Sequence, residues 1–430
     1  MIVDDEYIPM LEALPFGRRI AIGSWAGQPS RRAFDDVRRS GDDVYMLYTG
    51  GTTGMPKGVM WRHEDFFYAC CQGGDPLDPI SEPDQIARNV SPTLRLDPLA
   101  LGPLMHGGGQ WLTLTGLFCG GKAIVYCERS FDAEQVLDLV AAEKPTAIGI
   151  IGDAMARPLA EAVLAEPDRW DLSAVVTLGN GGAMLSSAVK TQLSEAFPTA
   201  LLLDSFGASE TGAAGSEIGA DPRSSRPAFS TDGRTWVLDP DTLDKLEPGS
   251  GSEGLLARRG HIPIGYWNDE AKTAATFRTD ADGVRWVLPG DWATIDSDNR
   301  IILFGRRSGW INTGGEKVFP EEVEAALRAH PDVLDAVVVG APDERMGESV
   351  VALIELRPGA GRIELDQLQE HCRAAIAGYK VPRRVLFGPA PRTNVGKPDY
   401  AAARALVSAS MVTDNEARGE HQPRPVDPNS

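Results

Sequence analysis

Glycine and threonine dominate residues 48–59, which read Tyr48-Thr-Gly-Gly-Thr-Thr-Gly-Met-Pro-Lys-Gly-Val59. The four glycines allow consecutive backbone N–H groups to turn inward and form a nest that attracts anions. Three threonine hydroxyls and the ammonium of Lys57 add further donors. An apolar run, Val44–Tyr48, precedes the segment and is typical of a buried strand. The residue types therefore predict a polyphosphate-binding loop, with a flexible glycine linker as the alternative.

Strands and helices alternate further along the chain. The expected strands are Ala123–Tyr126, Ala147–Ile151, Ala174–Leu178 and Leu201–Asp204, and the expected helices are Asp132–Glu143, Ala154–Ala165 and Ser186–Phe197. In the first of these helices Val136, Leu137 and Val140 share one face, and Ser186 is a suitable N-cap for the last. Such alternation predicts an α/β fold, with parallel strands covered by helices.

The regular alternation of strands and helices ends after Ser205. Short β signals and frequent turn residues between 215 and 300 indicate a smaller β-rich subdomain. Beyond a boundary near Gly305 we expect a compact α+β domain, with helices Pro320–Ala329 and Leu365–Ile376 and strands Ala336–Val339, Val350–Leu356 and Arg384–Phe387. The predicted organisation is a large domain over 1–304, a small one over 305–407, and a polar, disordered tail over 408–430. Near the N-terminus we expect short strands at Ile2-Val3 and Ile20–Ile22 and a helix at Tyr7–Leu14.

Composition restricts the function. With 42 basic and 61 acidic residues, the net charge of −19 disfavours a protein that coats nucleic acid or an anionic membrane. No apolar run approaches the ~20 residues of a transmembrane helix, and no signal peptide is evident. Five cysteines without CxxC spacing predict reduced thiols in a cytoplasmic protein. Whether the chain forms a homo-oligomer is left open.

Several ordered motifs carry a family resemblance. Residues 48–59 resemble the phosphate-binding signature of the adenylate-forming superfamily of acyl-CoA synthetases, adenylation domains and luciferases. Five further motifs follow in the family's order: Ser205-Phe-Gly-Ala-Ser-Glu-Thr-Gly212, Gly265-Tyr-Trp-Asn268, Gly290-Asp291 with Gly305-Arg306, Gly314-Gly-Glu-Lys317, and Pro391-Arg-Thr-Asn-Val-Gly-Lys397. The whole string looks most like the actinobacterial fatty-acyl-CoA synthetases, some of which act on steroid side-chain acids.

The resemblance implies a large adenylate-forming domain with a small mobile C-terminal domain, and a reaction in two halves. A carboxylate attacks the α-phosphorus of ATP and gives acyl-AMP and pyrophosphate, and the thiol of coenzyme A then displaces AMP. The expected substrates are a small-molecule carboxylic acid, ATP and coenzyme A, with Mg²⁺ as the cofactor. Catalysis of this kind depends on positioning and charge stabilisation.

The resemblance also assigns roles to individual residues. Lys397, Glu210 and Thr53 are expected to be catalytic, with Glu210 the Mg²⁺ ligand. The nucleotide is expected to contact Thr49, Gly50, Gly51, Thr52, Thr53, Gly54, Lys57, Gly181, Gly182, Ala183, Phe206, Gly207, Ser209, Asp291 and Arg306. His106 is assigned to the acyl pocket, and Gly309, Gly314, Gly315 and Lys317 to the hinge and the coenzyme A site. The alternatives are a helix-start carboxylate for Glu210, a core aromatic for Phe206 and a structural histidine for His106.

The chain departs from the family in two places. Only forty-seven residues precede Tyr48, fewer than in family members, so part of the first subdomain is expected to be missing. The hinge position, usually Asp or Lys, is Gly309. Two other functions therefore stay open beside an ATP-dependent acyl-CoA ligase: an acyl-AMP ligase that loads a carrier protein, and a non-catalytic remnant that binds nucleotide or acyl groups.

Overall fold

The computed structural model describes residues 2–3, 20–21, 38–49, 56–76, 79–82, 85–86, 95–128, 130–183, 185–219, 227–306, 310–313, 316–343, 345–393 and 396–417. The chain divides into two compact units, Met1–Asp43 and Val44–Ser430. In the first unit, β1 (Ile2–Val3) pairs in parallel with β2 (Ile20–Ala21). These two strands confirm the prediction there, whereas the helix predicted over Tyr7–Leu14 lies outside the described residues.

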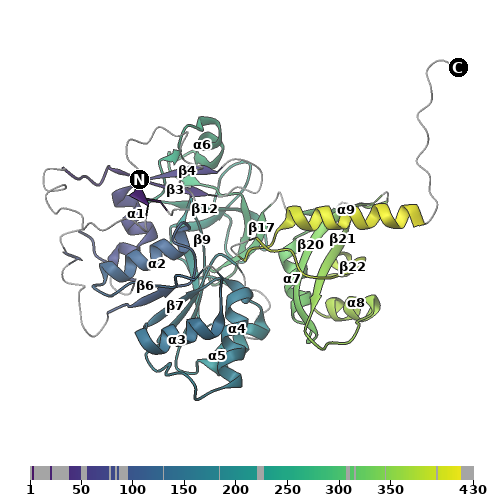
Figure 1. Ribbon diagram of the computed structural model, residues 1–430. Coiled ribbons are helices and arrows are strands. Elements are labelled where there is room, and N and C mark those ends of the chain that lie inside the picture. Colours follow the sequence, from purple (N-terminus) through teal and green to yellow (C-terminus); the bar gives the residue numbers. More distant parts are fainter. Residues whose placement is uncertain are drawn as a thin grey trace. The chain divides into compact units, whose positions relative to one another are not determined.

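The centre of the second unit is a six-stranded sheet with the order β10-β9-β8-β7-β5-β6 (Figure 1). Its strands are β5 (Pro98–Ala100), β6 (Ile124–Val125), β7 (Ala147–Ile150), β8 (Thr177–Asn180), β9 (Leu201–Ala208) and β10 (Gly212–Ile218). Successive strands from β5 to β9 are connected through α2 (Gly107–Phe118), α3 (Ala133–Glu143), α4 (Gly152–Ala165) and α5 (Ser187–Ala196). All pairs are parallel except β9 with β10, and the predicted α/β fold is thereby confirmed.

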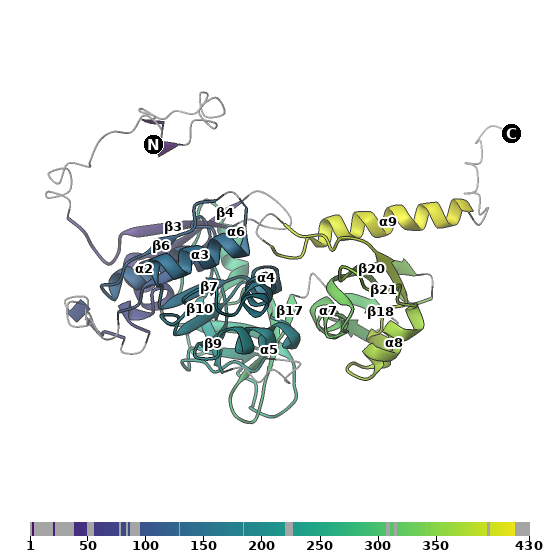
Figure 2. The same cartoon turned by 60° about the horizontal axis from the view of Figure 1, so that its bottom comes forward.

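The two faces of this sheet are covered by different helices. Ile148 and Ile150 of β7 belong to the core formed with α3, α4 and α5. Figure 2 turns these three helices toward the viewer. Gly149, between them, points to the opposite face, where a Cβ atom on it would lie 2.5 Å from a methyl group of Leu112 in α2. This alternation follows from the period of two along a strand.

Most predicted boundaries in this region are correct within a few residues. Asp132 and Ser186 cap α3 and α5, accepting hydrogen bonds from the backbone N–H groups of Gln135 and Val189. The predicted start of β8 at Ala174 is wrong, because the backbone there forms a turn in which the N–H of Val175 donates to the carbonyl of Leu172. Pairing begins only at Thr177.

The predicted β-rich subdomain is confirmed as an antiparallel sheet with the order β14-β15-β12-β16-β17, to which β11 adds at β12. Its strands are β11 (Thr235–Leu238), β12 (Gly254–Arg259), β14 (Phe277–Thr279), β15 (Arg285–Val287), β16 (Asp291–Ile295) and β17 (Ile301–Arg306), and α6 (Glu270–Thr276) precedes β14. A three-stranded sheet contains β3 (Val44–Thr49), β4 (Lys57–Arg62) and β13 (Gly265–Tyr266). Strand β4 is followed along the chain by α1 (His63–Cys70) and a 3₁₀ turn at Gln72–Gly74.

A five-stranded sheet follows β17. Its strands are β18 (Ile311–Thr313), β19 (Glu316–Val318), β20 (Val333–Asp343), β21 (Gly347–Leu356) and β22 (Arg384–Phe387). Ala336 and Val338 pack with α7 (Pro320–Arg328) and α8 (Leu365–Arg373), whereas Val337 and Val339 pack against α9 (Tyr400–Ala417). Figure 1 shows α9 and α8 on opposite sides of β20 and β21. The domain boundary at Gly305 stays a prediction.

The predicted disorder from Ser408 onward is wrong as far as Ala417, where α9 ends. The helix begins in an alanine-rich run, Ala401–Ala405, and no proline occurs between Tyr400 and residue 423, so the helix can continue. Ala403 and Val407, four residues apart, are buried against the sheet and anchor its first turns. Of the helices that the described residues form, none combines the length and apolar character needed to span a bilayer.

Candidate active site

The predicted phosphate loop is the connection of the β3–β4 hairpin. The two strands are antiparallel, and Thr49 and Lys57 are the last pair before the connection. The hairpin therefore places Thr49 and Lys57 side by side at one end of the sheet. The loop residues predicted to bind phosphate, Gly50, Gly51, Thr52, Thr53 and Gly54, lie outside the described residues.

Lys57 contacts side chains within and shortly after β13. Its Nζ atom lies 3.5 Å from Oδ2 of Asp269 and 5.6 Å from the centre of the Tyr266 ring. Both side chains of the ion pair are more than a third exposed, at 37% and 35%, and such pairs contribute at most about 1 kcal/mol. Lys57 can therefore exchange Asp269 for a phosphate group at little cost.

Glu210 lies in the turn between β9 and β10, so the helix-start alternative for this residue is wrong. The hydroxyl of Tyr266 donates to Oε1 of Glu210 at 2.8 Å. On the neighbouring residue, the carbonyl of Ser209 accepts a hydrogen bond from Nε1 of the buried Trp61 at 3.0 Å. Because Trp61 belongs to β4 and Tyr266 to β13, the turn is attached to the sheet that carries Lys57.

A cavity of about 340 Å³ is lined by residues predicted to bind the nucleoside. They are Gly182, Ala183, Phe206, Gly207 and Asp291. The Phe206 ring also packs edge-on against Phe229, with 4.8 Å between ring centres, so its cavity and core interpretations both apply. Asp291 begins β16 and is the cross-strand partner of Arg306 in β17. Neither Glu210 nor His106 is part of the cavity wall.

Buried polar contacts hold the loop at Gly182. Asn180, the last residue of β8, donates through Nδ2 to Oδ1 of Asp204 at 2.8 Å and to the carbonyl of Ala183 at 2.9 Å. Its Oδ1 atom accepts from the N–H of Gly152 at 2.8 Å. Gly182 itself has φ +81°, a conformation that strongly favours glycine. The shape of this loop therefore depends on tertiary contacts of Asn180.

An ion cluster completes this support. Lys190 of α5 is 2% exposed, and its Nζ lies 2.9 Å from Oδ2 of Asp204 and 3.4 Å from Oε2 of Glu217. Lys190 and Asp204 also line the cavity. No motif in the sequence includes Asn180, Lys190 or Asp204. The sequence offers one signal for Asn180 and Asp204: each is a polar residue within or at the end of an apolar strand.

Lys397 approaches the same loop. Its Cε atom lies 3.8 Å from the position that a Cβ atom on Gly182 would occupy. His106 stands at the N-cap position of α2 without a capping hydrogen bond from its side chain, and both burial and the charge of Lys397 lower the pKa of His106. The structure thus brings Lys397 close to Gly182, two residues predicted for different parts of the site, and the charge of Lys397 is felt at His106.

Other predicted residues fall outside the described part of the chain. These are Gly309, Gly314 and Gly315, together with the side chains of Arg306 and Lys317. Two residues that the structure shows in contact with predicted site residues were not predicted themselves. Tyr266 lies within the motif Gly265–Asn268, and Asp269 directly follows it. Their partners, Glu210 and Lys57, are distant in the chain.

The chain belongs to the family of AMP-binding enzymes. Residues 10–267 match that family, and residues 322–397 match the AMP-binding enzyme C-terminal domain. The resemblance predicted from the motifs is therefore confirmed.

The curated relatives that the chain matches include CoA ligases. The chain is 42% identical, over 91% of its length and 72% of the relative's, to the medium/long-chain-fatty-acid--CoA/3-oxocholest-4-en-26-oate--CoA ligase of Mycobacterium marinum. It is 43% identical, over 87% of its length and 68% of the relative's, to the 3-oxocholest-4-en-26-oate--CoA ligase of Rhodococcus rhodochrous. These names confirm the prediction of an acyl-CoA ligase.

Solved structures agree on the fold. The amide bond synthetase McbA of Marinactinospora thermotolerans has a TM-score of 0.77 at 24% identity, covering 94% of this chain and 79% of its own. The anthranilate CoA ligase AuaEII, solved with anthranoyl-AMP, has a TM-score of 0.75 at 24% identity, covering 95% and 78%.

Proposed function

We propose that this acyl-CoA ligase activates a medium- or long-chain fatty acid, or the side-chain carboxyl of a steroid, with ATP and transfers the acyl group to coenzyme A. The choice of acids rests on the names of the curated relatives. The observation that carries the proposal is the approach of Lys397 to Gly182 at the wall of the 340 Å³ cavity. That contact joins the catalytic lysine to the nucleotide site.

In the first half-reaction a carboxylate oxygen of the acid bonds to the α-phosphorus of ATP, and the bond to pyrophosphate breaks. We assign adenine binding to Phe206 and Gly182, and the ribose hydroxyls to Asp291, whose carboxylate can accept from both. Lys397 contributes positive charge where negative charge develops, an effect commonly worth a few kcal/mol. Lys57 and Thr49 bind the departing phosphates.

The residues present are compatible with magnesium bound through substrate. Within the described part of the chain, no three His, Cys, Asp or Glu side chains gather as ligands of a metal ion. Mg²⁺ commonly uses one or two carboxylates and completes its shell with phosphate oxygens and water, and Glu210, oriented by Tyr266, is suited to be that carboxylate. The ion, when bound, supplies charge neutralisation to the phosphates.

In the second half-reaction the thiolate sulfur of coenzyme A bonds to the acyl carbon and AMP leaves with the former acid oxygen. We retain Gly309, Gly314, Gly315 and Lys317 as residues proposed for the hinge and for coenzyme A. His106 is proposed to border the acyl group. Its lowered pKa favours the neutral imidazole, which suits an apolar acyl neighbour.

Two assays test the proposal. AMP release is measured with dodecanoate and ATP, first alone and then with coenzyme A, and a ligase turns over only when the thiol is present. Turnover with a carrier protein but not with coenzyme A would instead favour the carrier-loading alternative, and no AMP in either case would favour a remnant. Mass spectrometry of the thioesters formed from a mixed pool of fatty and steroid acids then identifies the acid.

The role of Lys397 is tested separately. We expect Lys397→Ala to slow adenylate formation by a factor on the order of 100 to 1,000, while thioester formation from supplied dodecanoyl-AMP continues. Lys122→Ala is the control, because Lys122 pairs with Glu143 at the surface. Equal loss of both half-reactions would contradict the assigned role.

A further inference from the structure

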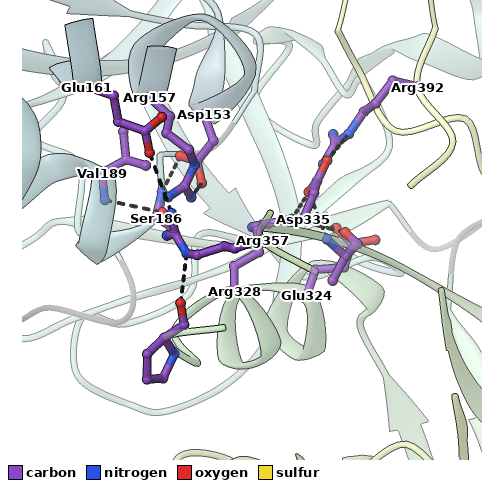
Figure 3. A network of polar contacts seen from close by, with 12 residues as sticks. Asp153, Arg157, Glu161, Ser186, Val189, Glu324, Arg328, Asp335, Arg357 and Arg392 are labelled. Carbon is purple, nitrogen blue, oxygen red and sulfur yellow. Dashed lines mark hydrogen bonds and ion pairs between the residues drawn. The ribbon is translucent and has the colours of Figure 1, made fainter. Parts of the chain in front are cut away.

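The segment that leads to Lys397 is held by two carboxylates on neighbouring strands. Glu355 of β21 accepts a hydrogen bond from the N–H of Ala390 at 2.9 Å. Asp335 of β20 accepts two hydrogen bonds from the Arg392 guanidinium. The distances are 2.8 Å from Nε to Oδ2 and 2.5 Å from Nη2 to Oδ1 (Figure 3). Asp335 and Glu355 are cross-strand partners, so the register of the sheet places both acids under the same segment.

Arg392 forms the base of a closed turn that ends at Lys397. Its Nη1 atom donates to the carbonyl of Gly396 at 3.4 Å. The N–H of Thr393 donates to the carbonyl of Lys397 at 2.8 Å, and the N–H of Lys397 donates to Oγ1 of Thr393 at 3.2 Å. Gly396 has φ +77°, which the turn requires and which glycine adopts without strain. The backbone of Lys397 is thus fixed relative to Arg392.

Asp335 is itself held in place. It follows a bulge in β20 between Val333 and Asp335, and its Oδ1 accepts from the N–H of Ala336 at 2.8 Å. The buried Arg328 lies 3.7 Å from Oδ1 and donates to the carbonyl of Ala336 at 3.2 Å. Figure 3 shows Glu324, Arg328, Asp335 and Arg392 as one group. The carboxylate that receives Arg392 therefore has little freedom to move.

We propose that Asp335 is a positioning residue for Lys397 and acts through its two-armed contact with Arg392. The inference rests on the proposed role of Lys397 in adenylate formation. A guanidinium held by two hydrogen bonds is fixed in direction as well as in place, which a lysine ammonium cannot reproduce. Displacement of a reacting group by about 1 Å can slow a reaction by a factor of about 100.

The test compares the two half-reactions in Asp335→Asn and in Arg392→Lys, each checked by a thermal melt. With dodecanoate and ATP, we expect kcat for adenylate formation to fall on the order of 100-fold. The KM for ATP and thioester formation from supplied dodecanoyl-AMP should stay close to the unmodified protein's. Asp332→Asn is the matched control, because Asp332 is an exposed acid three residues away and should leave both half-reactions unchanged.

A double variant separates positioning from general damage. If Asp335 acts through Lys397, then Asp335→Asn causes no further loss when Lys397 is already alanine. Should Asp335→Asn fail to fold, Thr393→Val removes one hydroxyl from an exposed position of the same turn and should again lower kcat for adenylation without a change in KM.

The outcomes are distinct. The positioning role is overturned, while Lys397 stays catalytic, by either of two results. One is near-normal adenylate formation in the folded single variants, and the other is a double variant in which the losses of the two single variants multiply. If Lys397→Ala alone leaves adenylation unchanged, the proposed function of Lys397 fails, and this inference falls with it.

Discussion

Replacement of Lys190 by methionine tests the support of the loop at Gly182. Lys190 is the cation that faces Asp204 and Glu217, and methionine keeps a similar length and apolar stem. The variant therefore removes the charge with little change in volume. Asp204 is only 4% exposed, so its carboxylate would be left in a buried site without its cation.

The expected magnitude follows from the distances. With an effective dielectric constant of about 20, Coulomb attraction amounts to about 6 kcal/mol at 2.9 Å and about 5 kcal/mol at 3.4 Å. Most of this gain is offset in the intact protein by the desolvation of the charges. Removing one partner of a buried ion pair nevertheless costs about 3–5 kcal/mol, because the desolvated partner stays uncompensated.

Hydrogen–deuterium exchange measures this loss where it occurs. A cost of about 3 kcal/mol should reduce protection of peptides from β8 and β9 by a factor on the order of 100. Peptides from β20 and β21 serve as an internal reference and should not change. Because Asp204 also binds Asn180, we expect the KM for ATP to rise as well.

Lys144→Met provides the matched control. Lys144 pairs with Asp171 at 3.0 Å, but the two side chains are 59% and 50% exposed, and such a pair contributes less than about 1 kcal/mol. If Lys190→Met lowers the exchange protection of β8 and β9 no more than Lys144→Met does, then burial does not make the Lys190 cluster more stabilising than an exposed pair.

Three further predictions concern the cavity, the proposed magnesium ligand and the proposed hinge. Glu321 of α7 also lines the cavity, and burial, with Glu324 and Asp291 adding negative charge, raises its pKa from 4.5 to about 8. The folded state then keeps a proton that the unfolded chain loses, so stability should fall as pH rises from about 4.5 to about 8; Glu321→Gln should flatten a series of urea melts across this range. Glu210→Gln should weaken the use of Mg²⁺·ATP in a magnesium titration without lowering the melting temperature, whereas a lower melting temperature would indicate a structural role. Gly309→Pro should slow the thioester step more than adenylation in single-turnover assays, because proline fixes φ near about −65°; equal slowing would place the pivot elsewhere.

Local sequence determined much of the fold. Helix α3 was predicted within one residue because its apolar positions repeat with the helical period and Asp132 can cap it. The phosphate loop and the Lys397 segment were also predicted from sequence, since glycine, threonine and lysine at close spacing carry their chemistry within a few residues. Boundaries at β8 and α9 were wrong, because a turn at Val175 and packing on β20 decide them.

Tertiary structure alone decided how the site residues are supported. The contacts of Tyr266 with Glu210 and of Lys190 with Asp204 join segments whose separation no local pattern records. Asp335 stands in none of the motifs, yet strand register places it beneath Arg392. Periodicity encodes which face of an element is buried, and motifs encode chemistry within one loop. A polar contact between distant segments depends instead on the register and packing of the elements that carry them, which only the folded chain defines.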